Sequence, residues 1–186
     1  LTMAMHCCGI GKGDEIITPP NSFIASTAAI LHLGAKPVFV DVGEDQNIDV
    51  KKIEKSITSK TKAIMPVHLT GRICEMNHIE KIAKKYNLII IEDAAQSIGS
   101  KYKNRFSGSF GKIGCFSTHP LKNLNACGDG GFITTNDLKI SNRIKSLRTH
   151  GMVDRDLISE FGYVSRMDNL QAAILNYRLN KLDEVI

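Results

Sequence analysis

The sequence contains no tryptophan and few aromatic residues, 6% in all. No apolar run approaches the roughly 20 residues that a membrane-spanning helix needs, so we do not expect a membrane protein. Neither sign of charge dominates, since 24 Lys and Arg stand against 19 Asp and Glu. With 42% hydrophobic residues the composition excludes a disordered chain, and 186 residues suffice for one well-filled core. The composition predicts a globular protein of one domain.

A concentrated basic stripe and aromatic stacking platforms, the usual marks of a nucleic-acid surface, are also missing. The lysines of segments 51–62 and 81–85 alternate with acidic and apolar residues, as on the solvent-facing sides of helices. We therefore expect no nucleic-acid partner for the net charge of +5.

Cysteine pairs with metal or redox spacing are absent. The five cysteines are irregularly spaced and include no Cys-x-x-Cys, so we expect no metal site. No charged and then apolar leader segment is present either. Free thiols in a reducing compartment are the simplest interpretation, which favours a cytoplasmic protein.

The two ends of the chain lack the signals of a complete domain. Residues 1–8 resemble the last turns of an apolar helix, closed by glycines but without a start signal. Residues 168–186 have apolar residues at helical spacing and stop without a cap. We expect a fragment in which residues 1–186 form one domain that is incomplete at its N-terminus.

Strand and helix patterns alternate between these ends. Apolar and β-branched runs predict strands at 15–18, 36–42, 62–67, 88–91, 113–117 and 131–135. Helical periodicity predicts helices at 22–33, 49–57, 75–86 and 137–148. Such alternation forms βαβ units, so we predict an α/β fold of three layers, αβα, with a mostly parallel sheet. Ligands of such sheets bind beyond the carboxyl ends of the strands.

The loop after residues 88–91 begins with Glu92 and Asp93, followed by two alanines. Asp93 therefore lies at the mouth of a buried strand, beside residues too small to block a ligand. Two interpretations are open. Asp93 can cap the turn that follows, or it can pair with a cationic group of a ligand.

The loop after residues 113–117 carries Lys122. A loop lysine is usually an ordinary surface residue, but this one lies between Leu121 and Leu124. The flanking leucines predict a partly desolvated amine, which favours its neutral, nucleophilic form. A glycine-rich stretch at 128–131 lets the backbone approach a ligand closely.

An acid and an amine at two strand mouths, with the hydroxyls of Ser117 and Thr118 between them, are the groups that pyridoxal phosphate requires. The lysine forms a Schiff base with the cofactor, the acid keeps its pyridine nitrogen protonated, and hydroxyls suit its phosphate. The sequence has no P-loop, no dinucleotide-binding glycine motif and no hydrolase nucleophile elbow.

Several motifs at fixed order and spacing resemble the DegT/DnrJ/EryC1/StrS family of sugar aminotransferases. They include G-D-E-I-I-T-P-P-N-S-F at 13–23, I-I-E-D-A-A-Q at 90–96, C-F-S-T-H-P-L-K-N-L at 115–124 and S-R-M-D-N-L-Q-A-A at 165–173. The resemblance implies the aspartate aminotransferase (type I) fold. It also implies that residues 1–186 are most of the large, cofactor-binding domain, and that a small C-terminal domain would follow Ile186.

The resemblance assigns cofactor-binding roles to six residues. Lys122 occupies the Schiff-base position, and Asp93 matches the acid that pairs with the pyridine nitrogen. Gln96 matches a glutamine beside the ring, and Ser117 matches a phosphate ligand.

The other assignments are weaker matches. Phe23 lies where many members stack an aromatic residue on the ring. His119 lies where the family has an aromatic residue or histidine, with packing as the alternative role. His68 and Gly71 match a family stretch for which a structural loop is expected.

One position departs from the family pattern. The family commonly has Asn where this chain has Val164, and that Asn reaches the cofactor phosphate of the neighbouring subunit. Valine cannot donate this hydrogen bond, although Ser165 is a possible substitute. The upstream Gly-Thr/Ser helix start, which also holds the phosphate in the family, would lie before Leu1.

By resemblance, Lys122 implies transamination, since related sugar dehydratases have His at this position. The expected reaction moves an amino group from a donor, glutamate in most relatives, to a keto sugar attached to a nucleotide, within a homodimer that shares its active sites. Two alternatives remain open. One is a related pyridoxal phosphate enzyme, a dehydratase or cyclitol aminotransferase, and the other is a cofactor-binding fragment or regulator without turnover.

Overall fold

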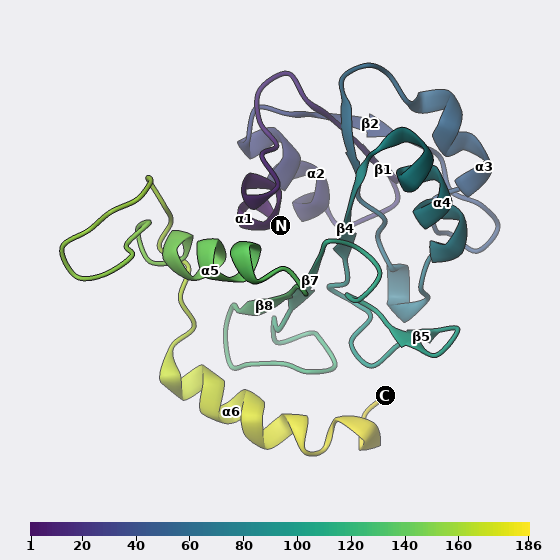
Figure 1. Ribbon diagram of the computed structural model, residues 1–186. Helices are drawn as coiled ribbons and strands as arrows, with labels where there is room; N and C mark the ends of the chain where they lie inside the picture. The colour runs from purple at the N-terminus through teal and green to yellow at the C-terminus, as the bar shows by residue number, and fades with distance from the viewer.

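The computed structural model describes residues 1–186 as three layers, with a sheet between two layers of helices (Figure 1). The six strands run in the order β2-β1-β3-β4-β7-β8. They are β1 (Glu15–Thr18), β2 (Lys36–Phe39), β3 (Thr61–Ile64), β4 (Ile89–Asp93), β7 (Ile113–Ser117) and β8 (Gly131–Thr134). All pairings are parallel except that of β7 with β8. The predicted α/β architecture is confirmed.

The helices cover both faces of the sheet. They are α1 (Thr2–Cys7), α2 (Ile24–His32), α3 (Val50–Ile53), α4 (Met76–Tyr86), α5 (Leu138–Leu147) and α6 (Asn169–Leu179), with 3₁₀ turns η1 (Glu54–Ser56), η2 (Leu69–Gly71) and η3 (Leu182–Glu184). One layer contains α1, α2 and α5, and the other contains α3 and α4 (Figure 1). No helix has the length and apolar character needed to cross a membrane.

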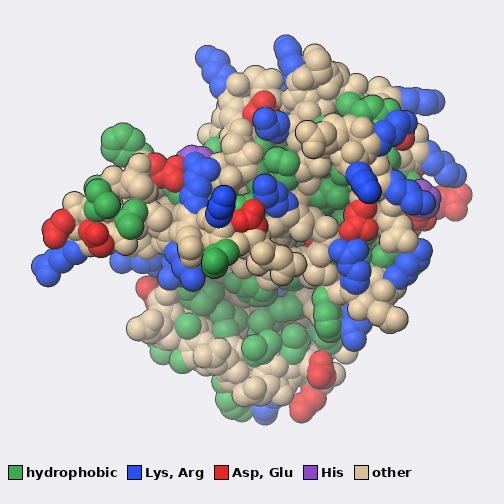
Figure 2. Space-filling view, viewed as in Figure 1, with side chains coloured by type: hydrophobic (Ala, Val, Ile, Leu, Met, Phe, Trp, Pro, Cys, Tyr) green, Lys and Arg blue, Asp and Glu red, His purple; other side chains and the backbone are tan.

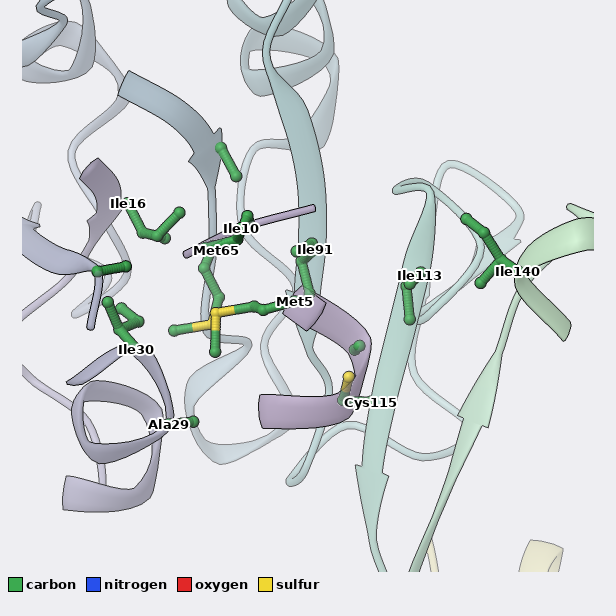
Figure 3. Packing of buried hydrophobic residues seen from close by; sticks show 13 residues of the cluster. Met5, Ile10, Ile16, Ala29, Ile30, Met65, Ile91, Ile113, Cys115 and Ile140 are labelled. Carbon is green, nitrogen blue, oxygen red and sulfur yellow. The ribbon is translucent and has the colours of Figure 1, made fainter. Parts of the chain in front are cut away.

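Alternate residues of the central strands point into opposite layers. On β1, Ile16 packs with α1 and α2, whereas Ile17 packs with α3 and α4. On β4, Ile91 and Ile90 divide in the same way. The buried residues thus form one hydrophobic cluster on each face of the sheet. Figure 3 shows the cluster on the side of α1, α2 and α5, with Met5 of α1 between the helices and the sheet. Because both sides of each strand are buried, the strands are continuous apolar runs without polar alternation.

Several elements are shorter than predicted. The strand predicted at 36–42 ends at Phe39, because its only partner, β1, ends at Thr18 before two prolines, which cannot extend the ladder. The helix predicted at 49–57 becomes the short α3 followed by η1, and the helix predicted at 168–186 ends at Leu179. The helix predicted at 22–33 begins at Ile24.

The sequence analysis missed one hairpin. Strands β5 (Lys101–Tyr102) and β6 (Arg105–Phe106) pair antiparallel around two residues with positive φ, Lys103 at 49° and Asn104 at 65°. Two-residue strands show no alternation, and lysine is not a typical residue for this conformation. The sequence therefore carries no clear signal of this hairpin.

Glu92, near the end of β4, holds two neighbouring loops by hydrogen bonds of its side chain. Its side chain is fully buried, and its Oε2 accepts hydrogen bonds from Nε2 of His68 at 3.0 Å and from the amide of Gly108 at 2.7 Å. Its Oε1 accepts from the amides of Phe110 at 2.7 Å and Gly111 at 2.6 Å. The loops at 68 and 108–111 are therefore joined to the end of β4.

His68 is buried beside Glu92 and has a structural role, as the sequence analysis expected for its loop. Its Nδ1 accepts from the amide of Cys74 at 3.4 Å, so the hydrogen of the neutral ring is on Nε2 and is donated to Glu92. Burial raises the pKa of Glu92, but the hydrogen bonds from His68 and from the amides of Gly111 and Gly108 outweigh it. The pKa of Glu92 therefore lies below its ordinary value of 4.5.

We expect Glu92→Gln to lower the free energy of unfolding by about 3 kcal/mol at neutral pH, because an amide cannot accept four hydrogen bonds and adds donors that face backbone amides. A carboxyl group whose pKa is depressed in the folded state stabilises the protein above its unfolded pKa, and this stability is lost as the pH falls through the folded pKa. The difference between the two proteins should therefore shrink in acid.

Urea unfolding at neutral pH and again below pH 4.5, the ordinary pKa of a glutamate, measures both effects. Glu80→Gln, which removes a surface ion pair with Arg105, is the control and should cost less than about 1 kcal/mol. An equal penalty for Glu92→Gln at both pH values would contradict the account.

Gly114 of β7 provides a test of packing beside the same edge. A Cβ atom there would lie 2.4 Å from Cα of Gly108 and 2.6 Å from Oγ1 of Thr134. We expect Gly114→Ala to lower the free energy of unfolding by about 1–3 kcal/mol, measured with urea. Gly11→Ala, where a Cβ would meet nothing within 4 Å, should change it by less than about 0.5 kcal/mol. Equal stability of the two variants would rule out the close approach at Gly114.

Candidate functional site

The loops after β4 and β7 lie at the same edge of the sheet. The two strands are parallel neighbours, and Asp93 at the end of β4 lies opposite Cys115. Because β8 is antiparallel to β7, its first residue, Gly131, lies opposite Ser117. The loop with Gln96, the loop with Lys122 and the glycine-rich stretch before β8 therefore begin or end at one edge.

Asp93 is a buried acid without a cationic partner in this chain. Its side chain is 5% exposed, and none of the ion pairs of the chain includes it. Its Oδ2 accepts a hydrogen bond of 2.7 Å from Oγ of Ser26 in α2, and its Oδ1 accepts one of 3.2 Å from the amide of Ala95. The second bond is the turn cap that the sequence analysis considered.

The carboxylate of Asp93 retains capacity for a ligand. Two oxygens offer about four acceptor positions, and only two are in use. A buried carboxylate without a counter-charge is costly, so the site favours a cationic group such as a protonated pyridine nitrogen. This donor set fits the ring of pyridoxal phosphate.

Ser117 lies on the same face of the sheet as Asp93. The register pairs Asp93 with Cys115, and Ser117 follows Cys115 by two residues, so all three point to one side. Ser117 is half-buried, and its Oγ accepts a hydrogen bond from the amide of His119 at 3.2 Å. A hydroxyl in that position still has its hydrogen to donate, for example to a phosphate oxygen.

The expectation that Thr118 shares this role is wrong. Thr118 is fully buried by the protein itself, so a phosphate cannot reach it. Its hydroxyl has no hydrogen-bond partner and lies against Gly130, where a Cβ atom would approach to 2.6 Å. Strand alternation explains the result, because adjacent residues of an extended chain face opposite sides.

Lys122 lies in a hydrogen-bonded turn. Its amide donates to the carbonyl oxygen of His119 at 2.8 Å, and the amide of Leu121 donates to Nδ1 of His119 at 3.2 Å. The lysine is half-buried, but the expected flanking by two buried leucines is only half correct. Leu124 is buried, whereas Leu121 is 88% exposed. One ring nitrogen of His119 is thus engaged in holding the turn.

The other predicted residues differ in how closely they approach this edge. Gln96 follows β4, and its Oε1 accepts a hydrogen bond of 2.7 Å from the amide of Thr70 in η2. Phe23 is 72% exposed and immediately precedes α2, one turn before Ser26. Val164 is 67% exposed and forms an isolated bridge with Thr149, far along the chain from both loops.

Two residues with clear roles were not identified from the sequence. Ser26 holds Asp93, but a serine inside a helical pattern carries no signal of its partner. Glu92 was noted only as a neighbour of Asp93, although its place in a buried apolar strand was itself a signal. A charged residue in such a strand needs internal partners.

Comparison with known proteins identifies the family of the chain. The model of the DegT/DnrJ/EryC1/StrS aminotransferase family matches residues 1–186. The chain is 49% identical over 185 residues to a dTDP-3-amino-3,6-dideoxy-alpha-D-galactopyranose transaminase of Aneurinibacillus thermoaerophilus, covering 99% of this chain and 51% of the relative. It is 44% identical over 182 residues to a pleiotropic regulatory protein of Geobacillus stearothermophilus, covering 97% and 49%.

Solved structures are similar over the same length. DesV of S. venezuelae, in complex with a ketimine intermediate, superposes with a TM-score of 0.95 at 40% identity, covering 98% of this chain and 50% of that one. NtdA of Bacillus subtilis, with bound cofactor PMP, superposes with a TM-score of 0.91 at 38% identity, covering 98% and 42%. The chain spans about half the length of the curated relatives it matches. By these matches, the chain belongs to the DegT/DnrJ/EryC1/StrS aminotransferase family.

Proposed function

We propose that the protein is a pyridoxal-phosphate-dependent aminotransferase that moves an amino group from a donor such as glutamate to a keto sugar linked to a nucleotide. The observation that carries the proposal is Asp93, a buried acid without a cation, on the strand next to the loop of Lys122. The relatives named as dTDP-sugar and UDP-sugar transaminases support the substrate class.

In this proposal Asp93 pairs with the pyridine nitrogen, and Ser117, on the same face, donates to the phosphate. Gln96 would lie beside the ring and Phe23 would stack on it, while His119 holds the turn of Lys122 by accepting a hydrogen bond from the amide of Leu121. When bound, the cofactor supplies an electrophilic carbon and a ring that withdraws electrons from the reacting bonds. The unpaired charge of Asp93 keeps that ring protonated.

Lys122 has two tasks in the reaction. Its Nζ is the amine that holds the cofactor between turnovers. With the cofactor bound, Nζ of Lys122 would serve as the group that accepts a proton from the amino donor and gives it back, as a general base and then a general acid. The turn around His119 fixes the backbone from which the side chain of Lys122 extends.

We further infer that residues 1–186 form most of the cofactor-binding large domain, in a cytoplasmic homodimer with shared active sites. Exposed apolar side chains on α6 support a partner surface. They include Leu170, Tyr177 and Leu179, with exposed fractions of 72%, 65% and 51%. Figure 2 shows hydrophobic side chains gathered in this lower part of the molecule, whereas most of the lysines and arginines visible in this view lie above it.

A second candidate function is a cofactor-binding fragment or regulator without turnover. Val164 favours it, because valine offers no hydrogen bond to a neighbouring subunit's phosphate. The name of the pleiotropic regulatory protein, at 44% identity, is in line with such a role. A related reaction, dehydration or cyclitol amination, is distinguished by substrate profiling.

We expect the protein with pyridoxal phosphate to show the visible absorbance band of a lysine-linked cofactor, and Lys122→Ala to lack it. Glutamate should bleach the band, because the amino group moves to the cofactor. Lys112→Ala, at the opposite end of β7, is the control and should keep both properties.

A band retained in Lys122→Ala, or absent from the unmodified protein, would contradict the assignment of Lys122. A lysine-dependent band that no amino donor bleaches, with no transfer to keto sugar nucleotides, would support the second candidate.

A further inference from the structure

Helix α6 lies against the loop that carries Lys122, although 44 or more residues separate their contacts in sequence (Figure 1). Leu175 of α6 packs with Leu124 and Ala126 in a small buried cluster. Oε1 of Gln171 accepts a hydrogen bond of 2.8 Å from the amide of Cys127. The loop is thus fixed to α6 on the C-terminal side of the lysine.

Arg178 of α6 also contacts the loop, beside the lysine turn. Its Nη1 donates to the carbonyl oxygen of Asn125 at 2.6 Å and also to Oδ1 of the same residue. Nδ2 of Asn125 in turn donates to the carbonyl oxygen of Pro120 at 2.7 Å. The two bonded residues, Pro120 and Asn125, lie on either side of Lys122. Arg178 therefore closes the turn through Asn125.

The residues on either side of Lys122 are exposed to solvent and add little packing to the turn. Leu121 is 88% exposed, and Asn123 is exposed as well. Arg178 is half-buried and takes part in no ion pair, so its charge is directed to the two oxygens of Asn125. Hydrogen bonds from a charged donor are stronger than neutral ones, and two of them from one nitrogen define the position of Asn125.

We propose that Arg178 is a positioning residue for Lys122, which acts through Asn125 to hold the turn that presents Nζ to the cofactor site. The inference rests on the proposed function. Small displacements of a reacting group have large effects, so loosening this turn should impair covalent attachment of the cofactor more than its binding.

Two cofactor forms separate attachment from binding. Pyridoxal phosphate has an aldehyde that can join Nζ with loss of water, whereas pyridoxamine phosphate has an amine and cannot. We expect Arg178→Met to weaken the apparent affinity for pyridoxal phosphate about tenfold, the change expected for loss of a charged hydrogen bond, as measured by titration of the visible band. Its affinity for pyridoxamine phosphate, measured by fluorescence or calorimetry, should change by less than about twofold.

Matched variants sharpen the test. Arg178→Lys retains a cation that can reach Asn125 and should restore part of the affinity for pyridoxal phosphate. Asn125→Ala should reproduce the loss, and the double variant should be no worse than either single one, because both act in one chain of contacts. Arg105→Met is the control, since Arg105 also donates to a side chain and to a carbonyl oxygen but lies on the β5-β6 hairpin.

Equal losses of both cofactor forms in Arg178→Met would overturn the inference in favour of a general structural role, and unchanged affinities would overturn it outright. If Arg178→Met does not fold, Arg178→Lys and Asn125→Ala decide by the same comparison. A band that persists in Lys122→Ala would instead refute the proposed function, so the two failures are distinguishable.

Discussion

The end of β4 places two buried carboxylates on opposite faces of the sheet, and the candidate site depends on this arrangement. Glu92 faces the layer of α3 and α4 and accepts four hydrogen bonds from His68 and three backbone amides. Asp93 faces the other layer and accepts only two, both from neutral groups. One acid is consumed in holding the sheet edge together, and the other is left with a charge that a ligand can use.

Elements distant in sequence hold the two proposed site residues, Asp93 and Lys122. Ser26 of α2 orients Asp93, and Arg178 of α6 closes the turn of Lys122 through Asn125. The parallel register of β4 with β7 brings the two loops to one edge, and the antiparallel β8 returns the glycine-rich stretch to the same place. The geometry of the candidate site therefore depends on helices that supply none of its proposed reacting groups.

The sequence predicted the layers and the sheet because strands buried on both sides are continuous apolar runs. It predicted strand ends less well, since the end of β2 depends on prolines that follow its partner β1. The residues of the candidate site were proposed partly from the resemblance, but which of their neighbours are buried and which are exposed was not predicted. Leu121 is exposed and Thr118 is buried against Gly130, and neither outcome can be read from the composition of the loop. The partners of Glu92 are mostly backbone amides, which no side-chain pattern reveals.

The most direct test of this division between the two acids is the affinity of Asp93→Asn for pyridoxamine phosphate, which binds without joining Lys122. The account predicts an affinity at least about tenfold weaker, because a neutral amide no longer offsets the charge of the pyridine nitrogen. It also predicts that the free energy of unfolding without cofactor falls by no more than about 1 kcal/mol, since removal of a buried charge without a cation offsets the weakened hydrogen bonds to Asp93. Undiminished binding of pyridoxamine phosphate by Asp93→Asn would contradict the account.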